Sequence, residues 1–468
     1  MRTTSLLLCA LAVGCADPAP TTTTTPATTS TAESHLLSPA KLDAALAAAL
    51  ASAAPGARHR VVITLDGSRT TAAIAAAVAS LGGGTLGFSK LPLIAARLTA
   101  TQIALVRNLA GIEALYLDRP LQLMLAQSRG TIHADGVHGL GVTGDGVAIA
   151  VLDSGVDGTH AGLSYPSKTV QNVKILAAPD DLFGMDLLGS DLLLENLPDT
   201  DTSTGHGTHV AGIAAGGGGT YAGVAPGAKI VGVSVGEGIN ILWALSGIDW
   251  ILEHRTQYGI RVVNNSWGTT GAFDAGDPIN IATKAMHDAG ITIVFASGNE
   301  GSAQDTLNPY SVAPWVIGVA AGCKIGADPT GSASQCNDGR ANLLADFSSR
   351  GIPGSTVYHP TITAPGVHIV SARSKTGTVM NVLDLQADAT TCAITPGDVL
   401  GHTCASGTSM AAPHIAGIVA LMLDANPGLT PTQIKEMLRA TARPMPGYAE
   451  WEVGAGYVDA LAAVDAVD

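Results

Sequence analysis

The sequence predicts an α/β protein in which a doubly wound parallel sheet follows a small α+β domain. Short apolar runs alternate with helical segments through the C-terminal two-thirds of the 468 residues, which is typical of a parallel sheet covered on both faces. One such run, residues 147–152, is continuously apolar and ends at Asp153. Open parallel sheets place their functional groups at the carboxyl ends of such buried strands.

The first 16 residues read as a signal peptide. Arg2 gives the N-terminal region its positive charge, and residues 6–13 form an apolar stretch too short to span a membrane. The stretch ends in A-V-G-C, which resembles a bacterial lipobox with Cys15 as the lipidated residue. Cleavage after Ala16, without an anchor, is the alternative. Residues 17–35 are rich in Pro and Thr and read as a linker, because such a composition cannot bury a core.

Residues 36–125 read as a compact α+β domain. Its apparent strands are 60–65, 91–98 and 113–117, and its apparent helices are 70–81 and 101–109. This order is that of a ferredoxin-like β-α-β-β-α-β domain, of which three of the four strands are recognisable.

Residues 126–468 form the larger domain. Its predicted strands are 147–152, 229–233, 261–265, 291–296 and 316–320. Its predicted helices are 206–215, 241–254, 278–289, 408–423 and 432–441.

The net charge of −14 is unevenly distributed: residues 1–125 carry +3 and the remainder −17. An acidic body argues against nucleic acid as a partner. The opposite signs predict that the two domains attract each other.

Three motifs carry the candidate chemistry, in the order Asp153 (D-S-G-V-D-G-T-H), His206 (G-H-G-T-H-V-A-G) and Ser409 (G-T-S-M-A-A-P-H). Ser409 lies where a Gly-containing turn enters a helix, and a helix N-terminus favours negative charge that develops beside the hydroxyl. Each motif has a simpler interpretation in isolation. Asp153 could be a turn residue, Ser409 a helix cap, and His206 with His209 a metal pair, although the glutamate of H-E-x-x-H is missing.

Together, in this order, the motifs resemble those of the subtilisin-like serine proteases from about residue 126 to the C-terminus. The segment F-A-S-G-N-E-G resembles the one that carries the family's oxyanion-hole asparagine, here Asn299. The resemblance implies an endopeptidase that works through an acyl-enzyme. His206 would be the general base, Asp153 would orient it, and Asn299 with the Ser409 N–H would bind the oxyanion. A catalytically silent peptide-binding protein on the same fold is the alternative.

The resemblance also implies a substrate cleft. The segments that would pair with an extended peptide contain Gly236, Gly238, Ser266, Trp267 and Gly268, and main-chain pairing of this type gives broad specificity. Trp267, with Ile241 and Ala244, would line an apolar pocket. Glu300 and Asn308 would lie in or near the primary pocket, where Glu300 would repel acidic side chains. Core packing and a surface turn are the respective alternatives.

Residues 36–125 would be the inhibitory propeptide of a secreted or envelope-attached monomer, removed by self-cleavage between Leu125 and Ala126. The protein's partners would then be peptide or protein substrates and its own propeptide.

No cofactor is expected. The family's strong calcium site uses an acidic residue where Gly162 stands, and the loop after residue 215 is reduced to four glycines. Acidic residues Asp199 and Asp201, or Asp180 and Asp181, could hold another ion, but solvated surface charge is the preferred interpretation.

Four cysteines remain after the signal segment, and they allow three pairings. We predict disulfides Cys323–Cys336 and Cys392–Cys404, each of which closes a short loop. Unpaired buried thiols are the alternative.

Overall fold

The computed structural model describes residues 40–88, 90–118, 122–123, 130–176, 192–236, 239–324, 343–377 and 397–467, with 380, 388, 392, 394 and 395. Several predictions concern residues outside these ranges: the signal and linker segments with Cys15, the Leu125–Ala126 bond, Gly238, Cys336, Asp180 and Asp181.

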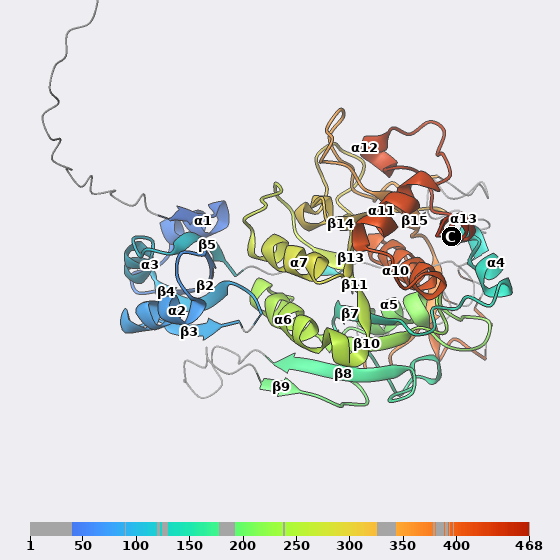
Figure 1. The fold of residues 1–468 in the computed structure, drawn as a ribbon, viewed down its shortest axis with the longest axis horizontal. Coiled ribbons are helices and arrows are strands. Elements are labelled where there is room, and N and C mark those ends of the chain that lie inside the picture. The colour runs from blue at the N-terminus through green and yellow to red at the C-terminus, as the bar shows by residue number, and fades with distance from the viewer. Residues whose placement is uncertain are drawn as a thin grey trace, which may run out of the picture. The chain divides into compact units, whose positions relative to one another are not determined.

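An eight-stranded sheet forms the centre of the larger domain (Figure 1). Its order is β15-β14-β13-β11-β7-β10-β8-β9, and all neighbours are parallel except β8 and β9. The strands are β7 (Ala148–Asp153), β8 (Thr169–Leu176), β9 (Leu192–Leu194), β10 (Lys229–Ser234), β11 (Ile260–Asn265), β13 (Thr292–Ala296), β14 (Val316–Gly322) and β15 (Ile362–Pro365). All five predicted strands are present, and β8, β9 and β15 are additional.

Helices cover both faces of this sheet, as predicted. The side chains of Ile149 and Val151 on β7 belong to one apolar core and those of Ala150 and Leu152 to another. The first core contains α5 (His206–Ala215) and α10 (Thr408–Ala425), and the second contains α6 (Ile241–Tyr258) and α7 (Pro278–Asp288) (Figure 1). The alternation along β7 follows from the two-residue period of a strand.

The smaller domain has the element order β-α-β-β-α-β. β2 (Arg58–Leu65), α2 (Thr71–Ser80), β3 (Gly84–Gly87), β4 (Leu93–Thr99), α3 (Ala100–Val106) and β5 (Ile112–Leu117) follow one another. Its strand order is β1-β5-β2-β4-β3, with β1 (Lys41–Leu42) at the edge beside β5, and α1 (Ala44–Ser52) follows β1. The strand missing from the sequence interpretation is β3, which begins and ends with glycine.

The remaining elements are short, apart from α11. They are β6 (Gln122–Leu123), α4 (Ala134–Gly139), β12 (Trp267–Gly268), β16 (Ile369–Ala372), β17 (His402–Ala405), α11 (Pro431–Ala440), α12 (Glu450–Val453) and α13 (Ala460–Asp465). Among the described residues, α10 alone is long and apolar enough to cross a membrane, and it is a core helix with 89% of its residues buried.

The two domains meet through charge pairs of the predicted sign. Lys41 of the smaller domain donates to Asp274 at 2.7 Å, and Lys90 lies 3.7 Å from Glu253. Both pairs are largely exposed, so each contributes little by itself.

One of the further contacts between the domains is buried. Asp118 accepts a hydrogen bond from the Leu242 amide in the first turn of α6 (2.9 Å) and pairs with Arg60 (2.8 Å). Asn240, the N-cap of α6, makes no side-chain cap of its own. The smaller domain therefore supplies the missing cap of a helix in the larger one.

Candidate active site

Asp153 and His206 meet where β7 ends and α5 begins. Both side chains are buried, and His206 Nδ1 lies 2.6 Å from Asp153 Oδ1. The same oxygen accepts the Ser154 amide at 2.8 Å. The carboxylate therefore fixes the orientation of the imidazole, and Nε2 is the nitrogen that proton transfer in a serine–histidine–aspartate triad would use.

Ser409 lies in the first turn of α10, which packs against α5. Its side chain is buried, and Oγ donates to the carbonyl of Ser266 at 2.8 Å, while the Ser266 hydroxyl donates to the carbonyl of Ser409 at 2.6 Å. Within the part of the chain that the structure describes, Ser409 makes no hydrogen bond to His206. Hydrogen bonds between a nucleophile and its base are often formed only with substrate present, so this geometry is compatible with the predicted pair.

Asn299 is held beside the N-terminus of α10. Its Oδ1 accepts both the amide and the hydroxyl of Thr408, at 3.0 and 2.9 Å. Because the carbonyl end is fixed in this way, the Nδ2 end of the half-buried amide is left to donate elsewhere. The Ser409 amide is one of the helix-terminal N–H groups that no carbonyl within the helix can accept. The two donors predicted for an oxyanion thus come from neighbouring residues.

The predicted substrate edge is paired with the chain's own backbone. β12 carries Trp267 and Gly268, which pair in antiparallel register with Leu123 and Gln122 of β6. β6 ends two residues before the predicted cleavage bond. Gly236, on the other predicted edge, has φ +85°, and a Cβ there would lie 2.7 Å from the ring of Trp243. Glycine is therefore required at this position.

Two of the predicted pocket residues belong to the core instead. Trp267 is fully buried, donates from Nε1 to the Leu152 carbonyl (2.8 Å) and packs edge-to-face on Phe295. Asn308 is also buried, and its Nδ2 donates to the carbonyls of Trp267 (3.1 Å) and Ala296 (2.9 Å). Trp267 thus contributes its backbone to the edge, and Asn308 supports that backbone from behind.

Ile241 and Ala244 are likewise buried in the core around α6. Glu300 is exposed, and its amide donates to the Ser349 hydroxyl at 2.9 Å. Its carboxylate is therefore accessible to solvent beside Asn299.

His209, the second histidine of the motif, is engaged by the protein itself. His209 is fully buried, and its Nε2 lies 3.2 Å from the Thr403 carbonyl. Burial lowers its pKa to about 3, so the ring is neutral. Among the described residues no group of three or more His, Cys, Asp or Glu side chains could hold a metal ion.

The place of the family's calcium site does not fit that ion. Gly162 and Gly216–Gly218 line a cavity of about 520 Å³ there, together with His160, His402, Lys375 and Asp398. Burial lowers the pKa of both histidines, which favours their neutral forms. A hard cation needs several oxygen ligands, whereas this lining has one carboxylate and the ammonium group of Lys375.

The preferred interpretation of Asp201 as surface charge is wrong, because its side chain is fully buried. Asp199, two residues earlier, is about half-buried and accepts a hydrogen bond from the Thr376 hydroxyl at 2.7 Å.

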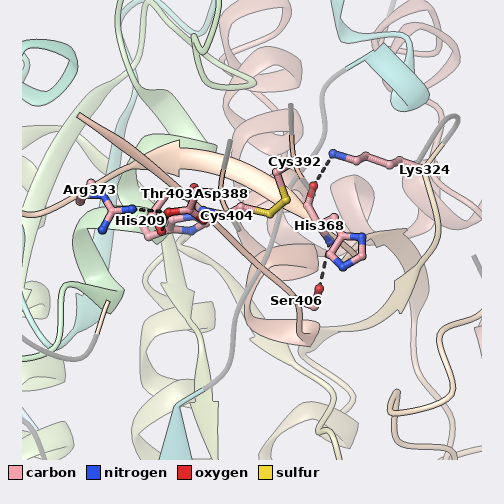
Figure 2. Close-up of a disulfide and its surroundings, with 9 residues drawn as sticks. All are labelled: His209, Lys324, His368, Arg373, Asp388, Cys392, Thr403, Cys404 and Ser406. Atoms are coloured by element: carbon pink, nitrogen blue, oxygen red, sulfur yellow. Dashed lines mark hydrogen bonds and ion pairs between the residues drawn. A yellow bond between two sulfur atoms is a disulfide. The ribbon is translucent and has the colours of Figure 1, made fainter. Parts of the chain in front are cut away.

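Cys392 and Cys404 form a disulfide, as predicted, just before the strand-to-helix turn that leads to Ser409 (Figure 2). Beside it, the buried carboxylate of Asp388 pairs with Arg373 and accepts the Cys404 amide at 3.1 Å. Cys323 is buried and disulfide-bonded, and its predicted partner lies outside the described residues.

Comparison with known proteins agrees with this geometry. Residues 144–458 match the model of the subtilase family. The serine protease AprX of Bacillus subtilis is 31% identical over 349 residues, which are 70% of this chain and 69% of AprX. Subtilisin E of the same species is 30% identical over 317 residues, which are 66% of this chain and 64% of subtilisin E.

A structural comparison gives the same fold. The crystal structure of fervidolysin from Fervidobacterium pennivorans superposes with a TM-score of 0.63 at 23% identity, over 91% of this chain and 63% of that one. The match to the family model covers most of the larger domain and includes Asp153, His206, Asn299 and Ser409. The chain belongs to the subtilase family and is a subtilisin-like serine endopeptidase.

Proposed function

We propose that this protein is a secreted endopeptidase of broad specificity that matures by cutting its own chain between Leu125 and Ala126. The observation that carries the proposal is the antiparallel pairing of β6 with β12. An extended substrate would pair with β12 in the same antiparallel way, and in the sequence β6 ends two residues before the predicted bond.

In the proposed mechanism, the Ser409 hydroxyl turns from the Ser266 carbonyl toward His206 and attacks the substrate carbonyl. His206 takes the hydroxyl proton and later gives it to the leaving amine, while Asp153 holds the ring and stabilises its charged form. The oxyanion accepts hydrogen bonds from Asn299 Nδ2 and the Ser409 amide. Water then attacks the acyl carbon while His206 takes its proton, the ester bond to Ser409 breaks, and His206 returns the proton to the serine oxygen.

Broad specificity follows from what the cleft offers. A peptide on β12 is read by main-chain hydrogen bonds, which all residues except proline can form. The side chains of Trp267 and Asn308 are buried behind that edge and are not free to select a substrate side chain. Glu300 is the exposed charge beside the oxyanion donors, so we expect selection against acidic residues at the cleavage position.

The smaller domain acts as the inhibitory propeptide in this proposal. Its support is the buried contact of Asp118 with the first turn of α6 and the opposite charges across the boundary.

Replacement of the nucleophile tests maturation. Ser409→Ala should accumulate as an uncut chain, while the wild type yields a new N-terminus within two or three residues of Ala126, measured by N-terminal sequencing. A fluorophosphonate should label Ser409 in the matured wild type. Normal processing of purified Ser409→Ala without added protease would overturn self-cleavage, and a folded wild type that never labels would favour the silent peptide-binding alternative.

For localisation, we propose export with attachment through lipidated Cys15. Cell fractionation of the uncut Ser409→Ala chain checks the anchor, because self-cleavage would separate Cys15 from the mature enzyme. In that background, Cys15→Ser should move the protein from the membrane fraction to the soluble extracytoplasmic fraction. Identical partitioning of the two proteins would reject the lipid anchor and would favour export by an ordinary signal peptide.

A further inference from the structure

A buried carboxylate that the mechanism above does not use lies five residues before His206. Asp201 has both oxygens fully engaged. Oδ1 accepts the Ser154 hydroxyl and the Gly205 amide, each at 3.0 Å. Oδ2 accepts the amide and the hydroxyl of Thr208, at 3.0 and 2.6 Å. A carboxylate with four donors is strongly oriented.

These hydrogen bonds join the two elements that carry the catalytic pair. On one side, Gly205 and Thr208 flank His206 in the first turn of α5. Gly205 is the N-cap of that helix and has no side chain to cap it, so Asp201 takes this role. On the other side, Ser154 directly follows Asp153, and its hydroxyl also accepts the Gly207 amide at 2.9 Å.

The backbone around this junction is packed closely. A Cβ on Gly207 would lie 2.2 Å from the Gly155 carbonyl oxygen and 3.0 Å from Asp153 Cβ. A Cβ on Gly155 would lie 2.6 Å from the Asp201 amide nitrogen. Since no side chains separate the two turns, the hydrogen bonds of Asp201 and Ser154 set how His206 meets Asp153.

Charge gives Asp201 a second effect. The N-terminus of a helix carries partial positive charge, which opposes protonation of a histidine in its first turn. A carboxylate at that terminus offsets this opposition. We propose that Asp201 is a positioning residue that seats the first turn of α5 on the end of β7 and stabilises the imidazolium form of His206. The proposal rests on the roles given to Asp153, His206 and Ser409 above.

Among the described residues, the other titratable groups near this junction include Asp153 on β7, Asp157 and Asp199 in the adjoining loops, His209 on α5, and Lys375, whose amide donates to Asp157. His209 stays neutral across the working pH range. Burial is the main cause that raises the pKa of Asp201, to about 6, with a smaller contribution from Asp153. Asp201 is therefore charged from neutral pH upward, where His206 must accept a proton during turnover.

The test compares the pH profiles of three variants, with activity normalised to the Ser409 sites that a fluorophosphonate labels. Asp201→Asn keeps the size of the side chain but removes its negative charge. It also replaces one accepting oxygen with an NH2 group, which faces donors that it cannot bond. We expect kcat to fall about 100-fold, the effect of a misplaced catalytic group, with little change in KM. The acid limb of kcat/KM should also move to lower pH, because the imidazolium of His206 loses a stabilising charge.

Asp201→Glu retains the charge, so its acid limb should stay at the wild-type pH although kcat falls. Asp199→Asn is the matched control. It removes a nearby charge but keeps the Oδ1 that accepts the Asp201 amide, and its profile should match that of the wild type. An unmoved acid limb in Asp201→Asn, or an equal displacement in Asp199→Asn, overturns the proposal.

Ser154→Ala provides a second test of the positioning role in case Asp201→Asn does not fold. It removes the hydroxyl that links Asp201 to β7 and leaves every charge in place. Its kcat should fall while the acid limb stays unchanged, and a wild-type kcat would overturn the positioning role. Failure of the wild type to hydrolyse peptides or to label would instead refute the function on which the proposal rests.

Discussion

At the scale of single residues, the amide of Asn299 is directed by its neighbour Thr408. Since Thr408 holds the carbonyl end through two hydrogen bonds, the other end is oriented before substrate arrives. Orientation of this kind stabilises the transition state without a reorganisation cost during the reaction.

We expect Asn299→Ala to lower kcat about 100- to 1,000-fold, a figure measured for the equivalent donor in subtilisin, with KM nearly unchanged. Steady-state kinetics on a peptide substrate measure both. Thr408→Val is the matched variant, because it removes one of the two donors that orient Asn299 and leaves the amide in place. Its kcat should fall by a smaller factor. Equal and small changes in kcat and KM for Asn299→Ala would contradict the assignment.

At the scale of elements, the two domains share a helix cap. Asp118 lies at the end of the smaller domain, yet it completes the first turn of α6 in the larger one and neutralises Arg60. Removal of Asp118 therefore leaves both an uncapped helix and a largely buried guanidinium without this partner.

We expect Asp118→Ala, made in the uncut Ser409→Ala chain, to lower the free energy of unfolding by about 1–3 kcal/mol. Thermal or denaturant unfolding measures the loss. The control is Lys41→Ala in the same background, which breaks an exposed ion pair and should cost less than about 1 kcal/mol. A loss for Asp118→Ala no larger than that of the control would show that the cap does not stabilise the uncut protein.

At the scale of the whole molecule, stability should not depend on the family's calcium ion. The lining of the cavity at that place includes glycines, two histidines, a lysine and the single carboxylate of Asp398. A chelator should therefore leave the melting temperature of the mature enzyme unchanged. A calcium ion whose free concentration is 100 times its Kd would stabilise the folded protein by about 2.7 kcal/mol. A clear drop in melting temperature would therefore reveal a calcium site elsewhere in the chain.

The sequence predicted the layered fold well because its central strands are continuous apolar runs. The strands that it did not reveal have polar or short sequences. β8 contains the buried Gln171 and Asn172, whose side chains are satisfied by tertiary contacts, such as that of Asn172 with the Val156 carbonyl at 2.8 Å. β15 has four residues and ends in a proline. Such strands are recognisable only when their neighbours are present.

In the candidate site, too, some features could be predicted from local sequence and others depend on tertiary contacts. The motifs around Asp153, His206 and Ser409 predicted a catalytic triad, and the structure places Asp153 within hydrogen-bond distance of His206. The burial of Asp201, Asn308 and Trp267 depends on which backbone groups approach from distant segments, and a single sequence does not encode this locally. The interpretations of these three residues consequently failed or were incomplete.

The pairing of β6 with β12 also affects how the enzyme responds to dilution. While the chain is intact, β6 is a tethered ligand whose effective concentration at the cleft is set by the length of its connections, not by the amount of protein in solution. The first cut should therefore be a first-order event with the same half-time at any protein concentration. After the proposed cut, the same strand would belong to a separate molecule, so its occupancy would fall as the solution is diluted. Export into a large external volume would by itself favour the uninhibited enzyme.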